Sequence, residues 1–252
     1  MEITYDNGGN IMLRLIFVIL VSLPYICFYL WKSSYIERHS NNFTEEERYR
    51  IAVDCVRIMK RNGFIRTEAY GTEHLPDDGG YVMFANHQGK YDALGIIISH
   101  EKPCTVVIDK KRSKLPIADQ FITLLQGTRL DKTSAKTQVQ GILKVVSEVT
   151  QGRRYIIFPE GGYCQNRNVV QEFLPGAFKC AVKSKSPIVP VALIDSYKPF
   201  ELNSIRPVKT QVHFLPPIYY EEYKELSTAE LAKITRERIV EVINKVEQVP
   251  HS

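Results

Sequence analysis

A histidine and an aspartate stand five residues apart in the stretch NHQGKYD, residues 86–92, directly after the apolar run YVMFA. That run, residues 81–85, predicts a short buried strand, and the abrupt change to polar residues around Gly89 predicts a turn at a sheet edge. Within a regular helix, two side chains five residues apart point about 140° away from each other. We therefore expect His87 to precede a helix and Asp92 to lie in its first turn, where the two can meet.

Such a pair has the chemistry of a general base with its orienting partner. Asp92 would accept the proton on one ring nitrogen of His87, which leaves the other nitrogen to take a proton from a substrate. The chain has no G-x-S-x-G motif, which disfavours a serine hydrolase, so the natural nucleophile is a substrate hydroxyl attacking an activated carbonyl. The alternative is a hydrogen-bonded structural histidine beside a helix cap. Metal binding is disfavoured, because no third ligand is suitably spaced.

A second motif repeats this arrangement in RRYIIFPEGGYCQNR, residues 153–167. The apolar run at residues 155–158 leads straight into Pro159, which ends sheet pairing, and then into Glu160. The two following glycines let the backbone approach a ligand closely and expose N–H groups. A plain turn also uses proline and glycine, but it does not explain a carboxylate at the tip of a buried strand.

Strand and helix patterns alternate from residue 65 onward, and we find no internal repeat. Thr44 with Glu47 forms a capping-box pattern that predicts an earlier helix, which Gly63 can end. The apolar face of this helix would either pack on the domain or lie on anionic lipid. We therefore predict an α/β fold, a single domain with a mixed, mainly parallel sheet covered by helices, whose polar motifs converge on one edge. The expected strands are residues 81–85, 105–108, 128–130, 155–158, 188–193 and 209–214, and the expected later helices are 134–150, 176–185 and 227–248. The last of these helices opens with a second capping-box pattern, Ser227 with Glu230.

An uncharged apolar run precedes this domain at residues 15–31, at the lower limit of the length that spans a bilayer. Aromatic residues near its end favour a membrane interface, Pro24 would bend a helix, and Arg14 could snorkel. A buried core helix and a cleaved signal peptide are the alternatives, but the acidic start and the absence of an A-x-A site disfavour the peptide. We expect an N-terminal membrane-anchoring helix and linker over residues 1–43, followed by the catalytic domain over residues 44–252.

The charge and cysteine content narrow the choice of partners and compartment. The net charge of +5 suits anionic lipids, phosphorylated metabolites or nucleic acid, but no aromatic-basic platform supports nucleic acid. Five cysteines without a C-x-x-C pair disfavour a zinc site or a disulfide framework and favour a reducing compartment. Basic residues after the apolar run, among them Lys32 and Arg38, predict by the positive-inside rule a membrane protein with its catalytic domain on the cytoplasmic side.

Four motifs, in order across roughly residues 65–220, together resemble those of the glycerolipid acyltransferases, specifically the 1-acylglycerol-3-phosphate (lysophosphatidate) acyltransferases. The first motif, N-H-x-x-x-x-D, is Asn86, His87 and Asp92, and the FLPGAF segment resembles the family's stretch before its fourth motif. The other three are GTRLDK at residues 127–132, FPEGGY at residues 158–163 and IVPV at residues 188–191.

The resemblance implies a membrane-bound O-acyltransferase of phospholipid biosynthesis that transfers a fatty acyl group to the free hydroxyl of lysophosphatidate, giving phosphatidate. It implies His87 as general base, Asp92 as its orienter, no cofactor and no metal. The partners would be a lysophospholipid, membrane lipid and an acyl-CoA or acyl-carrier-protein donor, without nucleic acid. The alternatives are the same chemistry on glycerol 3-phosphate or another lysophospholipid, a hydrolase, and a non-catalytic lipid-binding membrane protein.

By the same resemblance, Lys132, Glu160 and Gly161 would hold the glycerol phosphate. Two departures from the family pattern remove guanidinium groups: Lys132 replaces the usual arginine, and Gly162-Tyr163 replaces the usual Thr-Arg. Arg129, if it faces the site, and Arg167 are the candidates to supply the missing charge. Four apolar residues are candidates for an acyl channel, with ordinary core packing as the alternative: Phe121, Phe178, Val189 and Val191.

Overall fold

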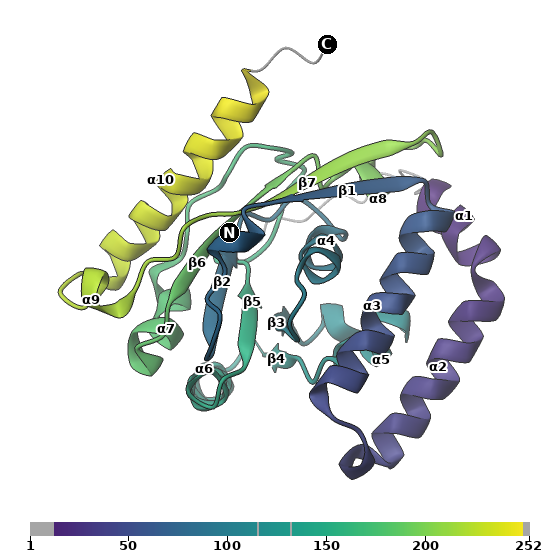
Figure 1. The fold of residues 1–252 in the computed structure, drawn as a ribbon, viewed down its shortest axis with the longest axis horizontal. Helices are drawn as coiled ribbons and strands as arrows, with labels where there is room; N and C mark the ends of the chain where they lie inside the picture. The colour runs from purple at the N-terminus through teal and green to yellow at the C-terminus, as the bar shows by residue number, and fades with distance from the viewer. Residues whose placement is uncertain (1–12, 115, 132, 249–252) are drawn as a thin grey trace.

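The computed structural model describes residues 13–114, 116–131 and 133–248, and a seven-stranded sheet forms their centre (Figure 1). The strand order is β1-β7-β6-β2-β5-β3-β4. The β6–β7 pair is antiparallel and the other pairs are parallel, which confirms the predicted mixed, mainly parallel sheet. The strands are β1 (Ile65–Tyr70), β2 (Tyr81–Ala85), β3 (Thr105–Asp109), β4 (Thr128–Leu130), β5 (Arg154–Ile157), β6 (Ile188–Ile194) and β7 (Val208–Phe214).

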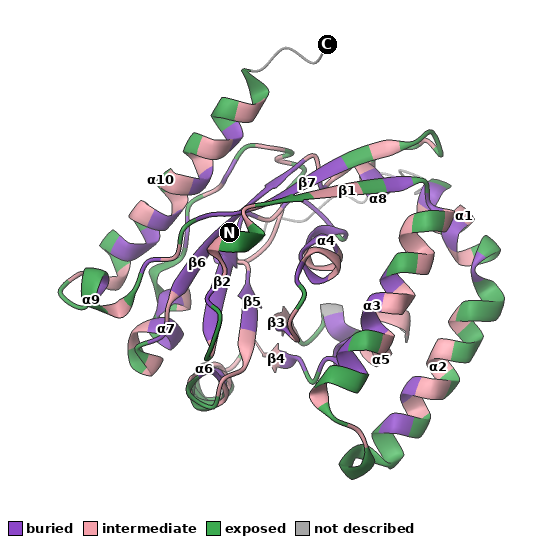
Figure 2. Cartoon of the chain, viewed as in Figure 1, coloured by how far each residue is buried: buried purple, intermediate pink, exposed green. Residues whose placement is uncertain are grey.

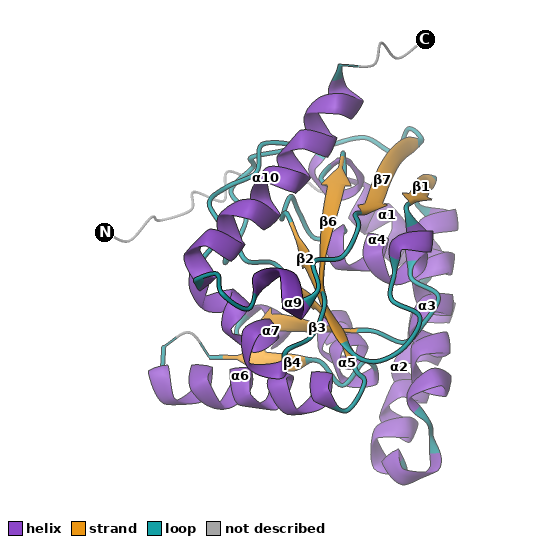
Figure 3. Ribbon diagram, turned by 60° about the vertical axis from the view of Figure 1, so that its left-hand side comes forward, coloured by secondary structure: helices purple, strands orange, loops and turns teal. Residues whose placement is uncertain are grey.

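Helices cover both faces of the sheet (Figures 1 and 3). One face packs against α6, α7 and α10, and the other packs against α3, α4 and α5. The capping boxes predicted at Thr44 and Ser227 are present at the starts of α3 and α10. The helices are α1 (Leu13–Val21), α2 (Leu23–Arg38), α3 (Glu45–Asn62), α4 (Asp92–Ser99), α5 (Pro116–Leu124), α6 (Ala135–Thr150), α7 (Lys179–Ser184), α8 (Lys198–Glu201), α9 (Tyr220–Tyr223) and α10 (Thr228–Glu247).

Strand β2 shows why these runs are apolar throughout. Its alternate residues Val82 and Phe84 pack into the core under α6 and α10, while Tyr81, Met83 and Ala85 pack into the core under α3 and α4. A central parallel strand covered on both faces has no solvent side, so every position is buried (Figure 2).

All six predicted strands are present, with ends shifted by no more than one residue. Strand β1 was missed because its sequence, IRTEAY, is mostly polar. It lies at the edge of the sheet and pairs with β7 alone, so most of its side chains are half-buried or exposed. An edge strand of this kind carries little periodic apolar signal.

The expected single anchoring helix is not observed. The apolar run is divided at Ser22 into α1 and α2, whose axes bend by 75°, with Pro24 in the first turn of α2. Across the described ranges, no individual helix has both the length and the apolarity needed to cross a bilayer. The bent α1–α2 pair, taken together, meets both criteria by length and composition. The two helices lie against the domain, α2 beside α5 and α1 beside α8, and the division at residue 43 stays a prediction.

The position of Arg14 also differs from the expectation that this residue could snorkel. Its side chain does not snorkel; it is 1% exposed, and its guanidinium donates to the carbonyl oxygens of Lys198, Pro199 and Arg206. These carbonyls belong to α8 and the segment after it, so the charged group attaches α1 to the α/β domain.

Candidate active site

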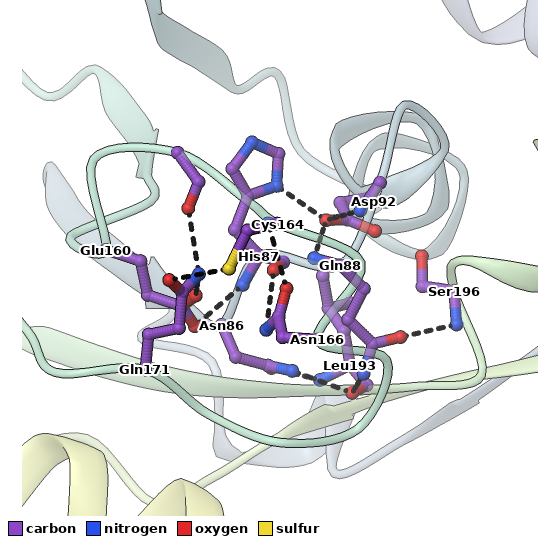
Figure 4. Close-up of polar contacts among 12 residues, drawn as sticks. Asn86, His87, Gln88, Asp92, Glu160, Cys164, Asn166, Gln171, Leu193 and Ser196 are labelled. Carbon is purple, nitrogen blue, oxygen red and sulfur yellow. Dashed lines mark hydrogen bonds and ion pairs between the residues drawn. The ribbon is translucent and has the colours of Figure 1, made fainter. Parts of the chain in front are cut away.

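His87 and Asp92 meet at the end of β2, as the sequence predicts. His87 lies in the turn after the strand, Asp92 is the first residue of α4, and Nδ1 of the histidine is 2.7 Å from Oδ2 of the aspartate (Figure 4). The Asp92 side chain is fully buried and that of His87 is 15% exposed. The histidine therefore has an accessible side, while its partner is shielded from solvent.

The hydrogen bonds of Asp92 determine the histidine tautomer. Its Oδ2 also accepts the backbone N–H groups of Gln88 at 2.6 Å and Gly89 at 2.9 Å. A carboxylate oxygen that receives these donors is an acceptor for His87 as well, so Nδ1 carries the proton. Nε2 is then left as the basic nitrogen of the ring.

Two aromatic rings hold the imidazole from different sides. Phe158 stacks on it with ring centroids 4.3 Å apart, and Tyr163 meets it edge to face at 4.6 Å. These contacts restrict rotation of the ring and reduce the water around it.

Buried amide side chains brace the turn against β6. Asn86 forms two hydrogen bonds with the backbone of Leu193, donating to its oxygen at 3.0 Å and accepting from its nitrogen at 2.7 Å. Gln88 donates to the same oxygen and accepts the N–H of Ser196. Gln88 was not singled out from the sequence, where a glutamine in a polar turn looks solvent-exposed. The structure buries it completely.

Glu160 reaches the same turn from β5. Its Oε1 accepts the backbone N–H of His87 at 3.0 Å, and its Oε2 accepts from Gln171 at 2.6 Å. Burial raises the pKa of Glu160 to about 7, although both hydrogen bonds act in the opposite direction. Gly161 follows with φ +73°, and a Cβ atom there would lie 2.9 Å from a methyl carbon of Leu174. Both conditions favour glycine.

A cavity of about 1180 Å³ includes His87 and extends under the N-terminal helices. Gly161, Gly162 and Tyr163 line it near the histidine, and apolar side chains of α1, α2, α3, α5 and α6 line much of the remainder. Phe121 lines this cavity, as the acyl-channel interpretation expects. The other three channel candidates, Phe178, Val189 and Val191, are fully buried in the two packed cores.

The basic candidates are more dispersed. Arg129 donates to Asp119 and Thr123 of α5 and lines a second, smaller hollow, so it does not face His87. The guanidinium of Arg167 lies over the ring of Tyr197 at 5.8 Å, and the preceding residue, Asn166, donates to the carbonyl oxygen of His87. The loop that carries Arg167 is thus at the site. Lys132 lies outside the described residues.

A histidine–aspartate pair at the carboxyl edge of a mixed α/β sheet, beside a long apolar cavity, is suited to acyl transfer onto a hydroxyl. A family model described as Acyltransferase matches residues 66–194, and the chain belongs to that family.

Individual relatives agree with this assignment. The chain is 26% identical over 186 residues to the 1-acyl-sn-glycerol-3-phosphate acyltransferase alpha of Mus musculus, a match that covers 72% of this chain and 65% of that protein. It is 28% identical over 174 residues to the 1-acyl-sn-glycerol-3-phosphate acyltransferase of Escherichia coli K12, covering 67% and 70%. The chain thus spans just under two thirds of the length of the mouse relative.

The fold also matches a solved structure. The crystal structure of the 1-acyl-sn-glycerophosphate acyltransferase PlsC from Thermotoga maritima superposes with a TM-score of 0.76, covering 95% of this chain and 97% of that one. The identity in this match is 19%, so it shows a shared fold.

Proposed function

We propose that this protein is a membrane-bound 1-acyl-sn-glycerol-3-phosphate O-acyltransferase, which forms phosphatidate from lysophosphatidate and an acyl thioester. The observation that carries the proposal is the 2.7 Å contact between His87 and Asp92 in the turn that lines the large apolar cavity. The names of the relatives support this choice of acceptor over other hydroxyl compounds.

In the proposed reaction, Nε2 of His87 removes the proton from the acceptor hydroxyl as its oxygen attacks the thioester carbonyl. The new ester C–O bond forms, the C–S bond breaks, and the thiolate leaves with the proton from the imidazolium. Asp92 stabilises the imidazolium through Nδ1 without taking the proton itself. The reaction needs no covalent acyl-enzyme, since the acceptor supplies the nucleophile.

We place the acyl chains in the apolar part of the cavity. Its volume exceeds the usual range for one small ligand, roughly 300–1,000 Å³, and is suited to long chains. The acceptor headgroup lies by this proposal near Glu160, Gly161 and Arg167, on the two loops that meet at His87. The predicted role of Lys132 stays a prediction, and Arg129 has no part in the proposed headgroup site because its guanidinium is held by Asp119 and Thr123.

The membrane association that we propose is shallow rather than a single crossing helix. Large apolar side chains on the outer surface of α1 and α2 are exposed, including Leu20 at 66% and Trp31 at 64%. An exposed apolar surface of this kind suits insertion into one leaflet. Insertion there would place the cavity next to the membrane that contains the lipid acceptor. The cytoplasmic side stays a prediction from the basic residues that follow the apolar run.

The proposal is tested by acylation of lysophosphatidate with the full chain in membranes, offering acyl-CoA and acyl-carrier-protein donors. We expect phosphatidate from the wild type, and kcat lowered about 10²–10⁴-fold by His87→Ala and by Asp92→Asn. The exposed histidine variant His39→Ala is the matched control and should keep wild-type activity. Full activity in a folded His87→Ala protein would contradict the proposed mechanism.

Another lysophospholipid is the second candidate acceptor, and Tyr163 is the reason to consider it. Its ring lies against His87 at the position where the resembling family carries a basic residue. Offering lysophosphatidate, glycerol 3-phosphate and a zwitterionic lysophospholipid to the same enzyme distinguishes the acceptors by their kcat/KM values.

A further inference from the structure

A second hollow, of about 350 Å³, lies between β3, β4 and α6. Lys110 and Lys144 contribute two positive charges to its lining, and Asp131 contributes the only carboxylate among the residues that line it. Arg129 also lines the hollow, but its guanidinium is paired with Asp119 of α5. Thr128, Thr137 and Gln140 add hydroxyl and amide groups. This lining has the composition of an anion site, since cations and neutral donors exceed the single acid.

The two lysines of the hollow are held only weakly by their present partners. Lys110 is 3.4 Å from Asp131, and Lys144 is 3.7 Å from Glu148 on the same helix. Both lysine side chains are about half exposed. Exposed pairs of this kind contribute little to stability, so a phosphate can compete for the ammonium groups.

The hollow lies at the edge of the sheet that carries His87. Lys110 follows β3 and Asp131 follows β4, just as His87 follows β2, and these strands are parallel in the order β2-β5-β3-β4. Three strand spacings separate β2 from β4, which is roughly 14 Å. The large cavity adjoins the basic hollow, because it is lined by His87, Asp109 and Leu130 and shares Gly141 with that hollow.

We infer that this basic hollow binds the phosphate at the far end of the donor's pantetheine arm. The inference rests on the proposed function, in which the donor is a thioester of that arm with its carbonyl at His87. An extended pantetheine chain between sulfur and phosphate is about as long as four peptide units, roughly 14 Å, which matches the distance across the strands. Acyl-CoA and acyl-carrier protein share this phosphate, so the site serves either carrier.

The test compares palmitoyl-pantetheine 4′-phosphate with palmitoyl-pantetheine as donors for the full chain in membranes. We expect the wild type to prefer the phosphorylated donor in kcat/KM by about tenfold, the effect of two charge-assisted contacts. In the double variant Lys110→Ala/Lys144→Ala, the ratio of kcat/KM for the two donors should fall toward one, while KM for the acceptor lipid is unchanged. A wild type without the preference, or a double variant that keeps it, would overturn the inference.

The matched control is Lys233→Ala/Lys245→Ala on α10. Each of these lysines is exposed and pairs with a glutamate four residues away on the same helix, as Lys144 does. This variant should keep the wild-type preference; an equal loss would mean that net charge, and not the hollow, is responsible.

The same assay is repeated with three complete donors: palmitoyl-CoA, palmitoyl-dephospho-CoA and palmitoyl-carrier protein. The carrier that the wild type accepts identifies the source of the phosphate. If the double variant instead loses discrimination between CoA and dephospho-CoA and keeps the pantetheine preference, the hollow binds the ribose phosphate and the inference is wrong. Absence of acyl transfer from every donor to any lysophospholipid would refute the proposed function itself.

Discussion

His87 receives a different kind of support from each residue around it. Asp92 orients the ring through Nδ1, Phe158 and Tyr163 confine it, and Glu160 accepts the backbone N–H behind it. Glu160 is the most unusual of these groups, because it is a buried carboxylate that accepts hydrogen bonds from the neutral His87 backbone and Gln171 side chain and has a pKa raised to about 7. Its protonation therefore links the stability of the turn to pH in the neutral range.

At the scale of the residue, we predict that Glu160→Gln removes one pH-dependent contribution to the free energy of unfolding. The ordinary pKa of this carboxyl is 4.5, so between pH 4.5 and about 7 the folded protein binds more protons than the unfolded chain at this position. Glu160 thus makes the free energy of unfolding decrease as pH rises through that window. Urea unfolding of both proteins from pH 4.5 to 8 should show the decrease from this residue only in the wild type.

The exposed substitution Glu237→Gln on α10 is the control and should leave the pH profile unchanged. Groups that titrate identically in both proteins cancel in the difference between the curves. Parallel profiles for the wild type and Glu160→Gln would show that Glu160 is ionised in the folded state across this range.

At the scale of elements, the N-terminal helices depend on one buried charge. The guanidinium of Arg14 donates to carbonyl oxygens on α8 and in the segment that follows it, and α1 and α2 line the large cavity. The same contacts that fasten α1 therefore also maintain a wall of the proposed acyl site.

We predict that Arg14→Met loosens α1. Methionine fills similar space but cannot donate, so the free energy of unfolding should fall by about 2–3 kcal/mol and amide exchange in α1 should accelerate. Arg57→Met, at an exposed ion pair on α3, is the matched control and should change stability by less than about 1 kcal/mol. Unchanged exchange in α1 would mean that its apolar contacts alone hold it.

At the scale of the whole molecule, the sheet edge that carries His87, the cavity and the exposed surface of α1 and α2 are combined in one domain. The exposed apolar side chains are suited to a lipid surface, and the cavity beneath these helices leads to His87. A bound lipid could then supply the acceptor hydroxyl without passing through water.

We predict that Leu20→Glu/Trp31→Glu weakens binding to phospholipid vesicles more than tenfold, because each substitution removes about 1.5–3 kcal/mol of apolar transfer energy. Vesicle sedimentation measures the effect. Val169→Glu is the control, since Val169 is 71% exposed in a loop whose next residue packs in the core under α10. Equal binding by the double variant and the wild type would exclude these helices as the membrane contact.

The sequence by itself determined six of the seven strands and the His87–Asp92 pair. Local signals were sufficient for the six strands of apolar residues, for the capping boxes at Thr44 and Ser227, and for the meeting of His87 with Asp92. Each of these depends on residues close together in the chain, where periodicity and turn chemistry decide the geometry.

The tertiary structure alone decided what depends on distant partners. Strand β1 exists because β7 supplies its hydrogen bonds, and Arg14 is buried because carbonyls nearly two hundred residues away accept from it. Arg129 faces away from His87 because Asp119 and Thr123 hold its guanidinium. The direction of a long side chain and the volume of a cavity follow from packing across the fold, and no local pattern in the sequence encodes them.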